Sequence, residues 1–461
     1  MIKVVNSPLF RESSSRYDED SLPPIGLGYI ATHLHNNGID VEIIDAVAEN
    51  ITLQELIDRL SSARPQFIAS NIFTTNYRLV QELVESIEFA THFIIGGLST
   101  KDLYKEIINW KTDSQIDIVT GDGELITLDI VKNCVREIPF LELQKRRVFN
   151  VFSNSAYYVD NIDDVALNRT FFKNEPVIHP FGFNEANIIA SRGCIFNCTF
   201  CAAARSLNSE YGIRERSAES LICELASIKE LFPSVTSIRV LDDLFLKNGR
   251  HVEFATRVFS NFQFKWRSMA HVTTFNKVDN AKLVAMKDSG CDELFIGIES
   301  GSPKILRAIN KTHQVNTIVR NLTGVMRAGI NIKGYFIYGF PDESKEDMEL
   351  TYELALQLKE MSLRYGVNFR TSVFQYRPYH GTAIFHDLES NGLITEALKI
   401  EPDHELSALI GRLQFNFHTV NHSLVDLSDV HNYIYRTTNL TSVETLSKIN
   451  RHSKPSRKEA L

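Results

Sequence analysis

Long apolar runs are missing from this chain: no stretch reaches the ~18 consecutive apolar residues that a membrane-spanning helix needs. A signal peptide is missing too, because MIKVVNSPLF continues into polar residues without a small-residue cleavage site. We therefore expect a cytoplasmic protein without a membrane partner. An excess of positive charge is also absent, since the formal net charge is −8, so nucleic acid is not an expected partner.

Cysteine is scarce, with 6 residues among 461, which excludes a disulfide framework. Cys134, Cys223 and Cys291 stand singly, and we expect them to be small hydrophobic side chains inside the protein. The other three cysteines lie close together in sequence, as the ligands of a metal site in a reducing compartment do.

Residues 1–135 alternate short apolar strands with helix patterns five times, from IKVVNS to ELITLDIVKN. This pattern predicts an α/β fold with a doubly wound parallel sheet of Rossmann type. The near-continuous apolar strands, such as HFIIGG, are typical of a sheet covered by helices on both faces.

Three loops at the carboxyl ends of these strands are candidates for binding a large ligand. They are Asn71–Asn76, Gly96–Ser99 and Gly121–Glu124, and their glycine and hydroxyl residues would let a ligand approach the backbone. The candidate contacts in these loops are Asn71, Phe73, Thr74, Thr75, Gly96, Gly97, Ser99, Gly121, Gly123 and Glu124.

Residues 136–185 lose the regular period, and we expect a linker between domains there. The βα alternation resumes over residues 186–382 with six strands, which predicts a partial barrel that is open on one side and has its active site at the C-terminal strand ends. Residues 383–461 have no strand pattern and are expected to form a helical region that shapes the substrate pocket; ALIGRLQFNF and SDVHNYIYRT look helical.

The sequence SRGCIFNCTFC directly follows the first strand of the predicted barrel and places Cys194, Cys198 and Cys201 on one loop. Thiolates are the ligands of iron–sulfur clusters, and a cubane has four irons, so three cysteines leave one iron open. That iron could chelate the amino and carboxylate groups of S-adenosylmethionine (SAM). The alternatives are a zinc site, for which no fourth ligand follows at a normal spacing, and free thiols.

With these motifs the chain resembles the cobalamin-binding-domain class of radical SAM proteins over roughly residues 1–382. The resemblance implies an N-terminal cobalamin-binding domain, a partial (β/α)6 radical SAM barrel, a [4Fe–4S] cluster, SAM and cobalamin. It also implies that the three strand-end loops hold cobalamin. The chain lacks the Asp-x-His-x-x-Gly motif that supplies an axial histidine in some cobalamin proteins, so we expect cobalt without a protein imidazole ligand.

The resemblance extends to five segments: the cysteine loop, LDDLFLKN, DELFIGIESGS, GYFIYGFPDES and QYRPYHGT, which contains a Pro-Tyr-His-Gly-Thr turn. It implies that SAM is bound by Phe200, Asp242, Asp243, Glu299, Ser300, Ile337 and Gly339. Each segment also has a structural alternative. The two aspartates could cap a helix, and the glutamate could cap a helix or pair with a cation. Arg214 and Arg216 match a basic stretch of the family, but we expect them to form a solvated charged face.

The implied function is that of an enzyme that methylates an unactivated carbon of a small molecule or peptide in specialised-metabolite biosynthesis, through a 5′-deoxyadenosyl radical. It would take electrons from an external donor such as flavodoxin or ferredoxin. A non-methylating radical rearrangement or cyclisation is the alternative, and a non-catalytic sensor of cluster and corrin is a reading from another class. The residues identify neither the substrate nor a residue that assists catalysis.

Overall fold

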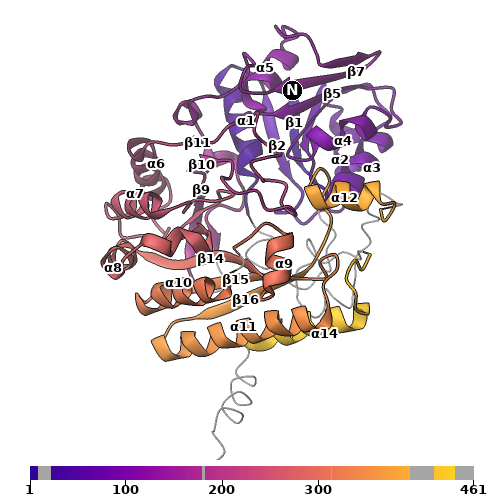
Figure 1. Cartoon of the computed structure of the whole chain (residues 1–461). Coiled ribbons are helices and arrows are strands. Elements are labelled where there is room, and N and C mark those ends of the chain that lie inside the picture. Colours follow the sequence, from indigo (N-terminus) through magenta and orange to yellow (C-terminus); the bar gives the residue numbers. More distant parts are fainter. Residues whose placement is uncertain (9–21, 179–181, 313, 395–419, 442–461) are drawn as a thin grey trace, which may run out of the picture. The chain divides into compact units, whose positions relative to one another are not determined.

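The computed structural model describes residues 1–8, 22–178, 182–312, 314–394 and 420–441 and is shown in Figure 1. These residues form two compact units. The first unit contains the described residues of 1–245 and 378–394, and the second contains those of 246–377 and 420–441. Within the described part of the chain, no helix combines the length and apolar character needed to cross a membrane.

The first unit is built around a seven-stranded sheet with the strand order β2-β1-β3-β4-β5-β7-β6. Every pairing in it is parallel except that of β6 with β7. Its strands are β1 (Ile2–Asn6), β2 (Val41–Asp45), β3 (Phe67–Asn71), β4 (His92–Gly96), β5 (Gln115–Gly121), β6 (Leu141–Leu143) and β7 (Arg146–Val151). The order of the first five strands is that of a doubly wound sheet of the flavodoxin type.

Helices cover both faces of this sheet, as predicted. The helices are α1 (Ile25–Asn36), α2 (Leu53–Ala63), α3 (Tyr77–Ser86), α4 (Thr100–Ile107) and α5 (Glu124–Val131). Buried residues of α2, α3 and α4 pack with Val5, Phe93 and Ile118 in one apolar cluster. Buried residues of α1 and α5 pack with Val4 and Val119 in the other cluster. Successive strand residues face opposite clusters, which is why these strands are apolar at nearly every position.

Residues 136–185, which we expected to be a linker, contain regular structure, and this expectation was wrong. The strand β7 extends the first sheet and buries Val148, Phe149 and Val151. Arg147 of this strand forms a bidentate ion pair with the buried Asp117 of β5. The charge of Arg147, which hides the strand pattern in the sequence, is thus neutralised by a residue of the neighbouring strand. The short helices η2 (Ile162–Asp164) and η3 (Arg169–Phe171) follow.

The rest of the first unit carries the cysteine segment. Its strands are β8 (Val177–Ile178), β9 (Asn184–Ile188), β10 (Ser191–Arg192), β11 (Arg214–Glu215) and β12 (Ser237–Val240), and its helices are α6 (Ala218–Leu231) and α12 (Ala383–Ser390). The strand β9 pairs in parallel with β12 and antiparallel with β8, while β10 pairs antiparallel with β11.

The second unit contains four strands that pair in parallel in the order β13-β14-β15-β16. They are β13 (Lys265–Ala270), β14 (Cys291–Glu299), β15 (Asn331–Tyr338) and β16 (Phe369–Gln375). The helices are α7 (Gly249–Phe259), η4 (Val272–Lys277), α8 (Asn280–Asp288), α9 (Pro303–Ala308), α10 (Val315–Arg327), α11 (Lys345–Tyr365), α14 (Leu427–Thr438) and η6 (Asn439–Thr441). In Figure 1, α14 runs beside α11.

The six strands predicted for residues 186–382 are all present, as β9, β12 and β13 to β16. The predicted helix SDVHNYIYRT is also confirmed, as α14, and its Thr437 hydrogen-bonds Tyr338 at 2.7 Å. The other predicted helix, ALIGRLQFNF, lies outside the described residues.

Candidate functional site

The three clustered cysteines lie on one tight loop that follows β10 in the first unit. The backbone N–H of Cys201 donates to the carbonyl of Cys198 at 3.2 Å, and the N–H of Arg205 donates to the carbonyl of Phe196 at 2.8 Å. These bonds fold the loop back on itself. All three cysteines are half-buried, as is Phe200 between them. The thiols are therefore partly shielded from water.

The charge around the loop is negative. The pKa of the Cys201 thiol is raised to about 12, first by burial and then by the negative charges of Asp243, Cys198 and Cys194. A metal-bound thiolate has lost its proton, so positive charge must enter this site for the three thiolates to coexist. In a cubane each thiolate binds its own iron. Among the described residues no three His, Cys, Asp or Glu side chains are grouped as ligands of a single metal ion.

The two predicted SAM-binding aspartates at the end of β12 have different surroundings. Asp242 is buried and accepts hydrogen bonds from the backbone N–H of Ala190 at 2.7 Å and from the hydroxyl of Ser191 at 2.6 Å. Asp243 is exposed. Neither residue caps a helix, because the next helix, α7, begins after Asn248. Asp242 thus holds the segment that leads into the cysteine loop.

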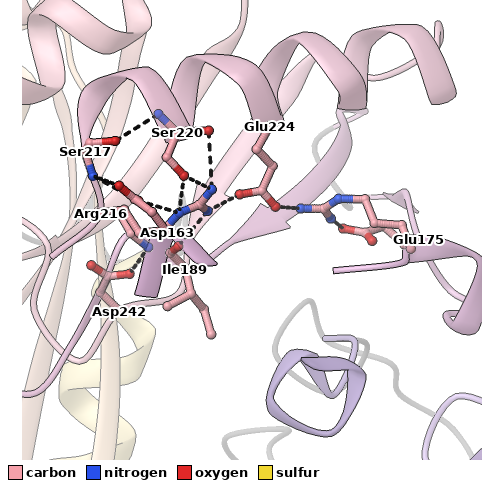
Figure 2. A network of polar contacts seen from close by, with 10 residues as sticks. Asp163, Glu175, Ile189, Arg216, Ser217, Ser220, Glu224 and Asp242 are labelled. Carbon is pink, nitrogen blue, oxygen red and sulfur yellow. Dashed lines mark hydrogen bonds and ion pairs between the residues drawn. The ribbon is translucent and has the colours of Figure 1, made fainter. Parts of the chain in front are cut away.

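A network of ion pairs fastens the same segment to α6 (Figure 2). Arg216 donates to the carbonyl of Ile189 at 3.2 Å and pairs with Glu224 of α6. Glu224 also accepts from Arg169 at 2.5 Å. Arg169 in turn pairs with Glu175, which accepts the backbone N–H of Asn187 in β9. The expectation that Arg216 lies on a solvated face was therefore wrong, because these acidic partners compensate its buried charge.

Arg214 is buried as well, so it too does not lie on a solvated face. It pairs with Asp122, in the loop after β5. In the register of β10 with β11, Arg214 lies opposite Arg192. Arg192 donates to Asp122 at 2.7 Å and to Glu124 at 2.5 Å. Two arginines and two carboxylates therefore form one compact charge cluster, which joins the loop after β5 to the start of the cysteine loop.

The three predicted ligand-binding loops follow β3, β4 and β5, which are adjacent parallel strands, so the loops share one edge of the first sheet. Two large apolar side chains are exposed at this edge: Phe73 is 42% exposed and Leu98 is 43% exposed. The Oδ1 atom of Asn71 is buried and has no hydrogen-bond partner among the described residues. This edge therefore has an exposed apolar surface, and an acceptor without a partner is buried beneath it.

The predicted contacts of this edge differ in their accessibility. Asn71, Thr75, Gly96, Gly97 and Gly123 are half-buried, Gly121 and Phe73 are exposed, and Thr74, Ser99 and Glu124 are buried. The carboxylate of Glu124 is held by Arg192, as described above.

At two of these positions the backbone of the protein leaves no room for any residue other than glycine. A Cβ at Gly97 would lie 2.6 Å from the carbonyl oxygen of Ile72, and one at Gly121 would lie 2.4 Å from that of Val151. Both residues also have a positive φ. At Gly96, by contrast, a Cβ would meet nothing closer than 3.8 Å. Replacing Gly97 or Gly121 would therefore disturb the loop, and Gly96 is the better position at which to add bulk.

A histidine that the sequence pattern did not assign to this edge also lies there. His380 is buried, its Nδ1 lies 3.1 Å from the hydroxyl of Thr74, and its backbone N–H donates to the same hydroxyl at 3.2 Å. Burial lowers the pKa of His380 to about 4, so its imidazole is neutral at pH 7. The three loops contain no histidine, but the Pro-Tyr-His-Gly-Thr turn, 306 residues further along the chain, supplies one.

The remaining predicted SAM residues lie in the second unit. Glu299 ends β14 with a φ of 66°, is buried and forms an ion pair with Lys311. Lys311 also donates to the carbonyl of Gly297 at 2.8 Å. Glu299 was expected either to bind SAM, to cap a helix or to pair with a cation, and in this structure it pairs with a cation. A ligand ammonium could exchange with Lys311 at this carboxylate.

Ser300, Gly339 and Ile337 surround the ends of β14 and β15. The hydroxyl of Ser300 lies 2.9 Å from that of Thr351 and accepts the N–H of Ser302, so it is used within the protein. The N–H of Gly339 donates to Glu343 at 2.6 Å. Gly339 has a φ of 91°, and a Cβ there would meet nothing closer than 3.6 Å. Ile337 is half-buried. Whether these residues share one SAM site with the cysteines stays a prediction.

Two family models match the chain. The B12 binding domain matches residues 18–131, and the Radical SAM superfamily matches residues 188–355. The first match contains all the predicted ligand-binding loops, and the second contains the cysteine loop together with Glu299 and Gly339.

The chain is similar to known proteins over most of its length. It is 28% identical over 388 residues to an uncharacterized methyltransferase, PH0819, of Pyrococcus horikoshii, with 81% of this chain and 80% of that protein covered. It is 21% identical to an anaerobic magnesium-protoporphyrin IX monomethyl ester cyclase of Cereibacter sphaeroides, covering 80% of this chain and 60% of the cyclase. The cobalamin-dependent SAM radical enzyme OxsB, solved with aqua-cobalamin and SAM, has the same fold, with a TM-score of 0.65 at 15% identity over 94% of this chain and 65% of OxsB.

Proposed function

Because the chain belongs to the radical SAM superfamily and carries a B12-binding domain, we propose that it transfers a methyl group to an unactivated carbon of a small molecule or peptide. Its cofactors are a [4Fe–4S] cluster, SAM and cobalamin. The observation that carries the proposal is the presence of both domains in one chain whose relative over 81% of its length is named a methyltransferase. When bound, the cluster and SAM supply a hydrogen-abstracting radical, and cobalamin supplies the methyl group.

The cluster would be held by Cys194, Cys198 and Cys201. Their fit rests on the folded loop, the partial burial of the thiols and the accumulation of negative charge beside Asp243. Asp242 stabilises the backbone that leads into the cysteine loop, because it accepts hydrogen bonds from Ala190 and Ser191. We therefore assign Asp242 to positioning the loop instead of to contacting SAM.

The SAM site would be completed by Phe200, Asp243, Glu299, Ile337 and Gly339. Glu299 would accept the SAM ammonium or a ribose hydroxyl, since a buried carboxylate needs a cation or donor and Lys311 now fills that place. Ser300 would support Gly301 and Ser302 through its bond to Thr351.

The cobalamin site would lie on the edge formed by Asn71–Asn76, Gly96–Ser99 and Gly121–Glu124. Phe73 and Leu98 offer apolar contact to a macrocycle, and the free Oδ1 of Asn71 could accept from one of the amides around a corrin ring. The glycine, serine and threonine residues of these loops have small side chains, which lets a flat ligand approach closely. His380 lies against this edge through Thr74.

A radical rearrangement or cyclisation remains the second candidate, favoured by the similarity to the cyclase. A sensor without turnover has no such support. We further propose a cytoplasmic location, a flavodoxin or ferredoxin as electron donor, and no membrane or nucleic-acid partner, in keeping with the net charge of −8.

The two enzymatic candidates differ in what they produce from SAM. The reconstituted protein is incubated with SAM, a reductant and hydroxocobalamin under anaerobic conditions, and its products are separated by liquid chromatography. A methyltransferase should form S-adenosylhomocysteine only when cobalamin is present, in addition to 5′-deoxyadenosine. Formation of 5′-deoxyadenosine alone, with and without cobalamin, would contradict methyl transfer and favour rearrangement.

A further inference from the structure

The charge cluster of Arg192, Arg214, Asp122 and Glu124 connects two loops that the proposed function assigns to different cofactors. Arg192 lies two residues before Cys194, whereas Asp122 lies in the loop after β5 and Glu124 is the first residue of α5. The guanidinium of Arg192 spans both carboxylates, with distances of 2.7 Å to Asp122 and 2.5 Å to Glu124. The two loops are thus joined by a single side chain.

The cluster is largely buried, although the Arg192 side chain is 21% exposed, and it is balanced in charge. Asp122 and Glu124 are 8% and 4% exposed, and Arg214 is 9% exposed. Asp122 also accepts the backbone N–H of Val159 at 3.1 Å and the guanidinium of Arg214. The pKa of Arg192 is raised: burial opposes this, but the charges of Glu124 and Asp122 outweigh it. A forked guanidinium between two fixed carboxylates has little freedom to turn, so a displacement of either loop is transmitted to the other.

The residues that directly precede Arg192, Ile189 to Ser191, are held in place by hydrogen bonds. Asp242 holds Ala190 and Ser191, and Arg216 holds Ile189 against α6 (Figure 2). A movement of Arg192 would therefore shift Gly193 and the cysteine loop that follows it, and not the residues that precede it. Gly193 has a φ of 92°, so it can pivot without the steric restriction of a side chain.

Resting on the proposed assignment of the two loops, we propose that Arg192 is a positioning residue that couples cobalamin binding at Gly121–Glu124 to cluster binding at Cys194–Cys201. Cobalamin bound at the first loop fixes Asp122 and Glu124, these hold Arg192, and Arg192 sets the position of Cys194. By linkage the effect is reciprocal, so the cluster must strengthen cobalamin binding by the same factor as cobalamin strengthens cluster binding.

The test measures the dissociation constant of hydroxocobalamin for the full chain with and without its reconstituted cluster, by equilibrium dialysis and cobalt analysis. Couplings between sites are commonly of the order of 5- to 150-fold, and we expect the ratio of the two constants in the wild type to fall in this range. In the double variant Arg192→Met/Glu124→Gln the ratio should fall to about one, whatever the change in the two dissociation constants themselves. The double change removes one positive and one negative charge together, so it leaves no new unpaired charge inside the protein.

Two further variants separate coupling from general damage. Arg192→Lys keeps the charge but cannot span both carboxylates, so it should retain part of the ratio. Arg216→Met removes a different arginine, which contacts the backbone before the cysteine loop at Ile189 but does not touch the cobalamin loop, and it should retain the ratio in full.

Four outcomes would overturn the proposal. These are a ratio of one in the wild type, an unchanged ratio in the double variant, an equal loss in Arg216→Met, and a wild type that binds no cobalamin. The last outcome also refutes the proposed function, whereas the first three refute the coupling alone.

Discussion

The substitution Asp242→Ala tests whether this aspartate anchors the cysteine loop or binds SAM. The carboxylate is buried and accepts two hydrogen bonds, from Ala190 and Ser191. The Ser191 hydroxyl can turn to another acceptor, but the N–H of Ala190 cannot turn. Leaving one buried donor without its partner costs about 1–3 kcal/mol.

This loss should be visible in the thermal stability of the protein. For 150–250 residues each kcal/mol lowers Tm by roughly 2–4 °C, so Tm should fall by about 2–12 °C. The assay is differential scanning fluorimetry of the cluster-free protein, followed by iron analysis after reconstitution. We expect both a lower Tm and incomplete iron loading, because the cysteine loop loses its support.

Asp243→Ala is the matched control, because Asp243 is the next residue and is exposed. It should change the free energy of unfolding by no more than about 0.5 kcal/mol, as surface changes commonly do, and therefore shift Tm by at most about 1–2 °C. If Asp242→Ala kept the wild-type Tm and iron content and instead weakened SAM binding, the anchoring role would be refuted and the direct SAM contact restored.

Three further predictions concern the cluster, SAM and pH. Anaerobic reconstitution should load about four irons and four sulfides, and replacing Cys194, Cys198 and Cys201 together by Ala should remove them; a retained cluster would show that the ligands lie elsewhere. Glu299→Ala should weaken SAM binding ~10- to 150-fold in equilibrium dialysis, the value of a hydrogen bond to a charged group, and unchanged binding would exclude Glu299 from the site. Burial raises the pKa of Glu343 from 4.5 to about 8, so the folded protein keeps a proton that the unfolded chain releases; its contribution to stability is full below pH 4.5 and is lost as the pH rises to about 8. Glu343→Gln should therefore flatten the pH dependence of the urea midpoint over this window, and an unaltered dependence would contradict the assignment.

The sequence predicted the sheet of the first unit because buried parallel strands are apolar on both faces. It failed at β7, where RRVFNV carries two arginines. One of them, Arg147, pairs with Asp117 across the sheet, and a periodicity rule counts such a charge against a strand. Local pattern alone cannot identify a charge whose partner is 30 residues away.

The sequence likewise predicted some residues of the candidate site and not others. The cysteine triad was found because its spacing lies within one loop. The roles of Arg192, Arg214 and His380 were not found, because their partners are far away in the chain: Asp122 precedes Arg192 by 70 residues, and Thr74 precedes His380 by 306. The sequence does contain a signal for the first pair, since the acidic GDGE loop and the arginine of SRGC each follow a strand.

The central claim is that the edge carrying Asn71, Gly96 and Gly121 binds cobalamin. The most direct measurement is the uptake of hydroxocobalamin by the purified full-length protein, followed by EPR of the Co(II) form. Stoichiometric uptake is predicted, without axial nitrogen superhyperfine splitting, because the three loops contain no histidine. Splitting from a nitrogen nucleus would show that a nitrogen base, either His380 or the dimethylbenzimidazole of the cobalamin itself, is a ligand of cobalt, and no uptake at all would contradict cobalamin-dependent methyl transfer.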